Sequence, residues 1–254
     1  MLLAVDARNR STVAGFLDGR TWLGQVRLGT DRTADELAFA LEAAGGRIPG
    51  SPVDEAWISS VVPAATPRLV EAVRTAFGVD ASVVGPGTRT GVRIRTDIPS
   101  EVGSDIVCSA AAARELCDGA SIIVDFGTAI VLTAVDSGGD LLGVSIAPGL
   151  ETAVAALRAS TAQMPDVRLE MPKRAIGRST VQSVQSGVLL GFGGLVERLV
   201  GLMQAEMGVP AEVLGTGDAL GRAVLSDIGL GRFEPDLVLR GLAAIAGRNR
   251  RAVD

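Results

Sequence analysis

The sequence contains no histidine and no tyrosine, and lysine occurs only once, as Lys173. The absence of histidine excludes Ser-His-Asp triads, imidazole bases and His-ligated zinc sites. Lys173 lies between Pro172 and Arg174, in a segment without the glycines of a phosphate-binding loop. A lysine-based nucleotide loop or a Schiff base is therefore nearly excluded.

Basic charge is also scarce. The 254 residues carry 24 Lys and Arg against 29 Asp and Glu, a net charge of −5. This acidic balance argues against nucleic acid or an anionic membrane as a partner. With 47% apolar residues, the chain is long enough for one large domain or two modest ones.

Cysteine occurs twice, as Cys108 and Cys117, inside one predicted helix. Nine residues of helix separate them by about 13 Å, which is too far for a disulfide. The N-terminus has no basic region and reaches Asp6 early, unlike a signal peptide. The longest apolar stretch, residues 187–203, includes Glu197, so we expect no membrane span. These features predict a soluble cytoplasmic protein with reduced thiols.

Hydrophobic periodicity and turn residues predict alternating strands and helices. Strands are predicted at residues 2–5, 12–17, 22–28, 56–61, 81–84, 121–124, 131–135, 141–146 and 212–214. Helices are predicted at 33–46, 66–77, 101–117, 150–161, 180–207, 219–225 and 235–249. Residues 85–99 form a long polar loop rich in Gly and Pro, of the kind that a compact domain usually keeps for function.

The chain contains an internal repeat. Asp6 ends a strand and Gly24 follows it by 18 residues; Asp125 ends another strand and Gly143 follows it by the same number. A single acid at a strand end is as often ordinary turn chemistry, but two copies at equal spacing indicate duplication. We therefore predict two β-rich halves, residues 1–117 and 118–254, with helices flanking a central cleft that both acids face.

Each predicted half carries a turn suited to phosphate. The turns after Asp6 and Asp125 hold small or hydroxylated residues, and Gly215 and Gly217 form a third turn after a short strand. Backbone amides in such turns can hold phosphates while the acids hold a cation or its water shell. Each turn alone is more often structural. Their combination predicts an α/β protein with a duplicated actin-like (ribonuclease H-like) fold, as in sugar-kinase-like phosphotransferases.

Ordered segments of the chain carry a narrower resemblance. They are residues 2–6, 58–63, 85–91, 97–105, 124–129, 146–149 and 177–181. In their order and spacing the chain resembles the type III pantothenate kinases along nearly its whole length. The resemblance implies ATP-dependent phosphorylation of pantothenate, the first step of coenzyme A biosynthesis, by a cytoplasmic dimer.

The resemblance also implies roles for individual residues. Asp105 would be the catalytic base. The residues expected at ATP and its phosphates are Asp6, Arg8, Asn9, Arg10, Ser11, Gly127, Thr128, Gly215 and Gly217. The residues expected at pantothenate are Gly103, Ser104, Asp105, Ile106 and Thr180. Asp125 would hold a monovalent cation, K⁺ or NH₄⁺, and Asp6 would hold Mg²⁺ through water.

Departures from the family pattern leave alternatives open. Arg8 and Arg10 replace a glycine and a hydroxyl residue in the first turn, and Ile106 replaces an arginine after the base. The two arginines either grip phosphate or block it. The chain is then a kinase as a homodimer, a kinase active only with a related subunit, or an impaired homologue that regulates or binds ligand. Residues 180–207, which include Gly187-x-x-x-Gly191, are the predicted interface helix.

Overall fold

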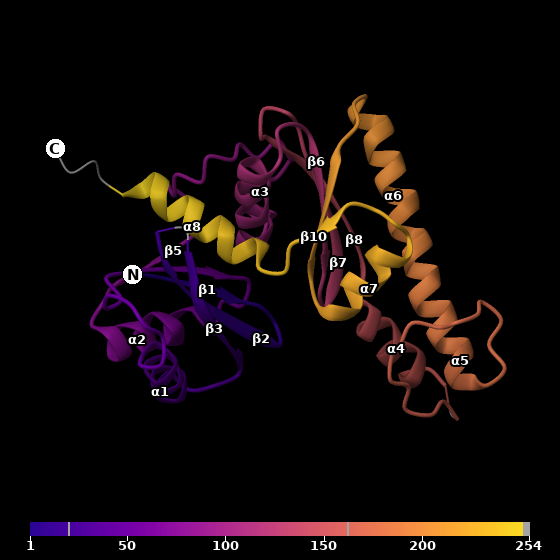
Figure 1. Cartoon of the computed structure of the whole chain (residues 1–254), viewed down its shortest axis with the longest axis horizontal. Coiled ribbons are helices and arrows are strands. Elements are labelled where there is room, and N and C mark those ends of the chain that lie inside the picture. Colours follow the sequence, from indigo (N-terminus) through magenta and orange to yellow (C-terminus); the bar gives the residue numbers. More distant parts are fainter. Residues whose placement is uncertain (20, 162, 251–254) are drawn as a thin grey trace. The chain divides into compact units, whose positions relative to one another are not determined.

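The structure, a computed structural model, describes residues 1–19, 21–161 and 163–250 and forms two compact units. Unit 1 comprises Met1–Arg93, Asp97–Leu116 and the C-terminal segment from Leu237; unit 2 comprises Ile94–Thr96 and Cys117–Asp236. The boundary after Leu116 lies one residue before the predicted division at residue 117. The C-terminal helix, in contrast, packs in unit 1 (Figure 1).

Unit 1 is a five-stranded mixed sheet in the order β3-β2-β1-β4-β5, with helices on both faces. Its strands are β1 (Leu2–Ala7), β2 (Ser11–Asp18), β3 (Thr21–Gly29), β4 (Glu55–Ser60) and β5 (Ala81–Val83). Its helices are α1 (Ala34–Gly45), α2 (Thr66–Phe77), the 3₁₀ turn η1 (Pro99–Glu101), α3 (Ser104–Leu116) and α8 (Leu237–Asn249).

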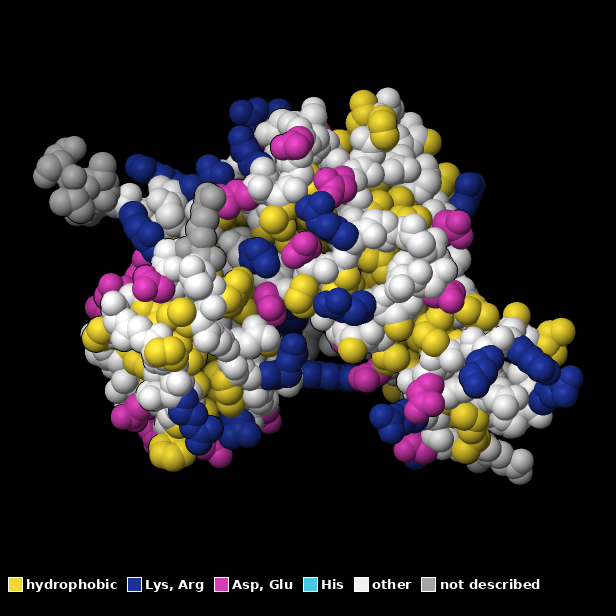
Figure 2. Space-filling view, in the orientation of Figure 1, with side chains coloured by type: hydrophobic (Ala, Val, Ile, Leu, Met, Phe, Trp, Pro, Cys, Tyr) yellow, Lys and Arg dark blue, Asp and Glu magenta, His cyan; other side chains and the backbone are white. Residues whose placement is uncertain are grey.

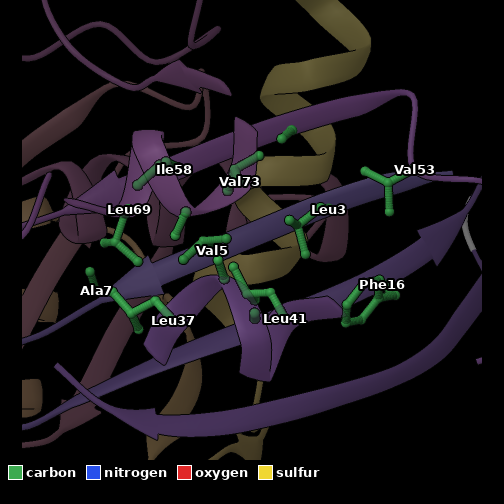
Figure 3. Packing of buried hydrophobic residues seen from close by; sticks show 14 of the residues in the cluster. Leu3, Val5, Ala7, Phe16, Leu37, Leu41, Val53, Ile58, Leu69 and Val73 are labelled. Carbon is green, nitrogen blue, oxygen red and sulfur yellow. The ribbon is translucent and has the colours of Figure 1, made fainter. Parts of the chain in front are cut away.

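The central strand β1 is buried along its whole length because helices cover both of its faces. Leu3, Val5 and Ala7 belong to the core beneath α1 and α2 (Figure 3). Leu2 and Ala4 belong to the opposite core, beneath α3 and α8. This division follows the two-residue period of a strand, and a strand buried on both faces reads as a continuous apolar run.

Local sequence signals mark the start of α1 and the end of α2. Thr33 and Glu36 form a capping box at the start of α1. Gly78 ends α2 in the left-handed conformation, with φ at 68°. Gly241 allows α8 to approach α3 closely, because a Cβ there would lie 1.8 Å from the carbonyl oxygen of Cys108.

Unit 2 repeats the sheet order of unit 1, as β8-β7-β6-β9-β10. Its strands are β6 (Ser121–Phe126), β7 (Ala129–Val135), β8 (Leu141–Pro148), β9 (Glu212–Gly217) and β10 (Arg232–Phe233). Its helices are α4 (Leu150–Ala159), α5 (Thr180–Gln185), the π-helical turn η2 (Ser186–Leu190), α6 (Gly191–Met207) and α7 (Ala219–Asp227).

The strand register confirms the duplication within the two sheets. Asp6 pairs with Val13 on β2 and with Ser59 on the parallel strand β4. Asp125 pairs with Val131 on β7 and with Thr216 on the parallel strand β9. Each acid therefore occupies the same position in its own sheet.

Two predicted helices differ from the structure. The helix predicted to begin at residue 101 begins at Ser104, because Val102 is extended (φ −76°, ψ 120°) and Pro99–Glu101 forms a separate 3₁₀ turn. The helix predicted at 180–207 is present, but residues 186–190 form a π-helical turn within it. Such turns interrupt helices mostly at functional positions.

The helix Thr180–Met207 is long and apolar enough to cross a membrane by length and composition alone, the single such helix in the described part of the chain. One face of it packs in the main core cluster of unit 2, through Val188, Leu189 and Val196. Charged residues interrupt it at Glu197 and Arg198.

On the face of the molecule that Figure 2 shows, side chains of both charges are interspersed with apolar ones.

Candidate functional site

The first candidate loop joins β1 to β2 and is built around a buried carboxylate. Asp6 is 5% exposed at the end of β1. The Nε atom of Arg8 donates a hydrogen bond to its Oδ2 atom at 2.7 Å. Asn9 and Arg10 are exposed at the tip, and Arg27 donates to the Oγ atom of Ser11 at 3.0 Å. The loop therefore combines an acid, a hydroxyl and several guanidinium groups.

Hydrogen bonds from a neighbouring segment hold the backbone of this loop. The hydroxyl of the buried residue Thr30 donates to the carbonyl oxygen of Arg8 at 2.6 Å, and the Thr12 and Thr30 hydroxyls are bonded at 3.0 Å. The amide of Arg8 donates to the carbonyl of Ser11 at 3.0 Å. Arg8 thus extends from a backbone fixed in place, which lowers the entropy lost when its side chain binds a ligand.

The N-terminus of α3 carries the predicted base. Asp105 lies half-buried in its first turn, and its Oδ1 atom accepts a hydrogen bond from the amide of Ile106 at 2.8 Å. A Cβ at Gly103 would lie 2.5 Å from the same oxygen, so a side chain there would displace the carboxylate from this position. An acid in this position is favoured by the helix dipole and by the amides of the first turn.

Ser104 fixes the start of α3 to the end of β4. Its hydroxyl is hydrogen-bonded to the Ser59 hydroxyl at 2.9 Å and accepts a hydrogen bond from the amide of Ser60 at 3.0 Å. Ser104 was predicted at the substrate from the resemblance, and that role stays a prediction. The contacts give its hydroxyl a positioning role for the neighbouring Asp105.

The buried thiol of Cys108 is influenced by both Asp6 and Asp105. Burial raises the pKa of this thiol well above its ordinary value of 9.0, and the negative charges of Asp6 and Asp105 raise it further. A hydrogen bond with Ser59 acts in the opposite direction. The charges of Asp6 and Asp105, both in unit 1, therefore act in the same direction on the Cys108 thiol.

The second candidate loop joins β6 to β7 and is shorter. Asp125 is half-buried on β6, and the turn at Gly127 and Thr128 closes with a hydrogen bond from the Gly127 amide to the carbonyl of Ala129 at 3.0 Å. The N-terminus of α4 packs against this turn: the Gly149 amide donates to the carbonyl of Thr128 at 3.0 Å. The side chain of Thr128 is exposed above it.

The turn between β9 and α7 depends on Gly217. Its φ is +105°, and a Cβ there would lie 2.1 Å from the carbonyl oxygen of Phe126. Asp218 follows as the N-cap of α7, accepting a hydrogen bond from the Gly221 amide at 2.7 Å. Gly215 is buried instead: a Cβ there would lie 2.4 Å from Leu225. Its predicted contact with ATP stays a prediction, and the structure shows a packing role.

The acids of unit 2 influence one another. Partial burial of the Asp218 carboxyl raises its pKa from the ordinary 3.8, and the charges of Glu151 and Asp125 add to the rise. The hydrogen bond from Gly221 opposes them. Across the described residues, no group of three or more His, Cys, Asp or Glu side chains is arranged to hold a metal ion.

Thr180, the predicted substrate residue of unit 2, opens α5 next to a basic cavity. Ser179 caps this helix, and Thr180 is exposed. The adjoining cavity has a volume of about 410 Å³. Its charged lining residues are Glu170, Lys173, Arg174 and Arg178. Arg168 contacts the one acid of this group at 3.6 Å, so the cavity is cationic.

The structure places the predicted residues in two groups, one in each unit. Unit 1 holds Asp6, Arg8, Asn9, Arg10, Ser11, Gly103, Ser104, Asp105 and Ile106; unit 2 holds Asp125, Gly127, Thr128, Thr180, Gly215 and Gly217. Sequence reasoning missed Thr30, Ser59 and Cys108. The one signal for Thr30 was its position directly after a predicted strand, since its contacts with the loop are distant in sequence.

Solved structures define the class of protein. The activator of 2-hydroxyisocaproyl-CoA dehydratase from Clostridium difficile, solved with bound ADPNP, superposes with a TM-score of 0.54 at 12% identity, covering 100% of this chain and 99% of that one. The inorganic polyphosphate/ATP-glucomannokinase from Arthrobacter sp. strain KM superposes with a TM-score of 0.52 at 15% identity, covering 98% and 99%. The duplicated sheets and these neighbours show the actin-like, sugar-kinase-like fold.

The family is narrower than the fold. The sequence pattern of the type III pantothenate kinases matches residues 2–201. The type III pantothenate kinase of Frankia alni is 40% identical over 98% of this chain and 100% of its own length, and that of Parafrankia sp. is 38% identical over 98% of both. The chain belongs to the type III pantothenate kinase family, a family of kinases. This confirms the sequence-based resemblance. Neither alternative, a kinase active only with a related subunit or an impaired homologue that regulates or binds ligand, gains support from it.

Proposed function

We propose that the chain transfers the γ-phosphoryl group of ATP to the primary hydroxyl of pantothenate, with Asp105 as the base. The observation that supports this most is Asp105 itself, held half-buried at the start of α3 by Gly103 and the Ile106 amide. Its carboxylate takes the hydroxyl proton, the hydroxyl oxygen forms the new bond to phosphorus, and the bond from phosphorus to the ADP oxygen breaks. The products are ADP and 4'-phosphopantothenate.

Each of the two duplicated turns offers, within its own unit, groups suited to the phosphates of ATP. The Asp6–Ser11 loop offers guanidinium and hydroxyl groups, and the Gly127–Thr128 turn offers an exposed hydroxyl and backbone amides. Gly217 keeps the third turn free of a side chain at its closest approach to β6. Kinases of this family use ATP with a divalent metal ion, which neutralises phosphate charge when it is bound.

The basic cavity of unit 2 supports an anionic substrate. Pantothenate carries a carboxylate, and Arg178 brings a guanidinium to the cavity two residues before Thr180. Lys173 and Arg174 add two further cations, and an arginine pairs with a carboxylate through two parallel hydrogen bonds. We place the carboxylate end of pantothenate near Thr180 and this cavity.

We propose that Asp125 holds the monovalent cation, K⁺ or NH₄⁺. Its half-buried carboxylate lies in a region where Glu151 and Asp218 add negative charge. A cation there relieves the repulsion among these acids. Replacing KCl by NaCl at constant ionic strength is expected to lower turnover, and Asp125→Asn is expected to abolish the difference. Equal rates of the unmodified chain in both salts would contradict this role.

We propose that the active form is a homodimer assembled through unit 2. Gly187, Gly191, Gly194 and Gly201 lie exposed along the helix Thr180–Met207, and a Cβ at any of them would meet nothing within 4 Å. Such a surface lets a second helix approach closely. Light scattering is expected to give twice the mass of the chain, and Gly191→Glu to give the monomer. A monomeric unmodified chain would contradict the proposal.

We also propose a cytoplasmic location. Cys108 and Cys117 are both free thiols, which suits a reducing compartment. A biosynthetic kinase needs ATP, which that compartment supplies.

The experiment that tests the proposed reaction identifies its product. The purified chain is incubated alone with ATP, pantothenate, Mg²⁺ and K⁺, and the mixture is analysed by mass spectrometry. We expect 4'-phosphopantothenate and ADP in equal amounts. ADP without phosphopantothenate, or no turnover by a folded chain, would contradict the proposal.

A further inference from the structure

The first loop holds a cation of its own. The Asp6 carboxylate, predicted to hold Mg²⁺ through water, accepts a hydrogen bond on Oδ2 from Arg8 Nε at 2.7 Å. The carboxylate side chain is 7% exposed and the arginine side chain 26% exposed. The acid is therefore almost enclosed, and a guanidinium already stands against it. Arg8 takes up the Oδ2 atom, so a metal ion held by that oxygen would meet the guanidinium charge at close range.

The arginine is oriented from both ends. Its backbone is fixed by the Thr30 hydroxyl at 2.6 Å and by the turn hydrogen bond to Ser11. Its side chain is fixed at Nε by Asp6. A guanidinium presents five N–H donors in a rigid plane, and its two terminal nitrogens match phosphate oxygens in pairs. Because the guanidinium group is planar, fixing the Nε atom also fixes the direction in which the two terminal nitrogens point.

We propose that Arg8 is the resident cation of the first loop: oriented by Asp6, it binds the phosphates of ATP directly, in place of a metal ion held by Asp6. The inference rests on the proposed function for the loop's role in ATP binding. It makes Asp6 a positioning residue, which acts on the nucleotide through Arg8. The divalent ion of the reaction then does not depend on Asp6.

ATP binding with and without metal ions tests this. Calorimetry on the full chain measures the ATP dissociation constant in Mg²⁺ and in EDTA. We expect the unmodified chain to retain measurable ATP binding in EDTA. Arg8→Gln is expected to weaken binding in EDTA at least about tenfold, the scale of a lost charge-assisted pair. Arg8→Lys, which keeps the charge, is expected to lose less. Arg47→Gln, at an exposed arginine elsewhere in unit 1, is the matched control and is expected to bind as the unmodified chain.

A direct metal readout separates Arg8 from Asp6. Electron paramagnetic resonance detects Mn²⁺ bound to the protein without nucleotide. We expect no Mn²⁺ to bind at Asp6 in the unmodified chain. In the Arg8→Gln variant we expect one additional bound Mn²⁺, held by Asp6. The double variant Asp6→Asn/Arg8→Gln removes the buried charge left by the single change, so it is expected to fold. It should show the same loss of ATP binding in EDTA and no gain of Mn²⁺.

The outcomes distinguish this inference from the proposed function. ATP binding by the unmodified chain in Mg²⁺ but not in EDTA, or unchanged binding by a folded Arg8→Gln variant, would overturn the role of Arg8 and leave the kinase proposal standing. No ATP binding in either buffer would overturn both.

Discussion

The β1–β2 turn and the β6–β7 turn occupy equivalent positions in the two sheets. They differ in the charged groups that surround the acid at the strand end. In unit 1 the acid at the strand end, Asp6, is enclosed and paired with Arg8. In unit 2 the corresponding acid, Asp125, is half-buried, and Gly127 stands where Arg8 stands in unit 1. Glu151 and Asp218 add negative charge to that region. The turn of unit 1 thus has an arginine beside its acid, whereas the turn of unit 2 is the one in which we propose a cation from solution.

The difference teaches that a repeat conserves the scaffold and not the chemistry. Both sheets have the same strand order, and both acids pair with a residue of the first antiparallel strand and of the adjacent parallel strand. Backbone hydrogen bonding keeps these positions, since a slip by one residue would turn every core side chain to the other face. The turn residues are under no such restriction.

The largest expected effect concerns the base, which unit 1 carries on α3. Asp105→Asn is expected to lower kcat by a factor of about 100 or more, because general-base catalysis contributes about 10²–10⁴-fold. Glu101→Gln, which removes an exposed carboxylate in the preceding 3₁₀ turn, is the matched control. Turnover of Asp105→Asn equal to that of the control would remove Asp105 from the mechanism.

The next test copies a residue of unit 1 into unit 2. Gly217 ends β9 and corresponds in register to Ser60, which ends β4, so Gly217→Ser gives the two parallel strands the same last residue. The new Cβ would meet the carbonyl of Phe126 at a positive φ. Strain and overpacking together are expected to cost about 3 kcal/mol of the free energy of unfolding.

Urea denaturation measures that loss. Gly143→Ser, on strand β8, is the control because a Cβ there meets nothing within 4 Å. Equal stability of the two variants would show that position 217 tolerates a side chain, and would contradict the steric requirement for glycine there.

A smaller effect is expected at the joint between β4 and α3. Ser104→Ala removes the hydrogen bonds to the Ser59 hydroxyl and the Ser60 amide. Polar groups left without partners there are expected to cost about 1–2 kcal/mol. Ser82→Ala, at an exposed serine on β5, is expected to change stability by less than about 0.5 kcal/mol. Chemical denaturation compares them, and a loss no greater than that of the control would contradict the positioning role.

The smallest expected effect is a pH dependence peculiar to unit 2. The pKa of Asp218 is raised above its ordinary 3.8, so the folded chain binds the proton more tightly than the unfolded chain. This contribution to stability is present at low pH and is lost as the pH rises through the raised pKa. Asp218→Asn keeps the cap on α7 and is expected to flatten the stability profile just above pH 3.8. An unchanged slope in thermal melts would contradict the shift.

Much of the fold could be predicted from the sequence because its signals are local. The equal spacing from Asp6 to Gly24 and from Asp125 to Gly143 predicted the duplication, because the length of a hairpin can be counted in the sequence. The position of α8 could not be predicted in this way. Its fit against α3 depends on Gly241 meeting Cys108, residues far apart in sequence whose contact no local pattern encodes.

The candidate site was predictable in its members more than in its contacts. The resemblance gave Asp6, Arg8 and Asp105, but it left open whether Arg8 grips or blocks phosphate. The hydrogen bond from Arg8 to Asp6 and the support from Thr30 decide where that guanidinium is held. Side-chain geometry of this kind depends on burial and on Thr30, a partner two strands further along the chain, which spacing alone does not convey.

The most direct test of unequal turns is a crystal structure of the chain with a non-hydrolysable ATP analogue. We predict that the Arg8 guanidinium contacts the phosphates while the Asp6 carboxylate still accepts its Nε–H. An analogue whose phosphates meet a metal ion held by Asp6, with Arg8 turned away to solvent, would contradict it.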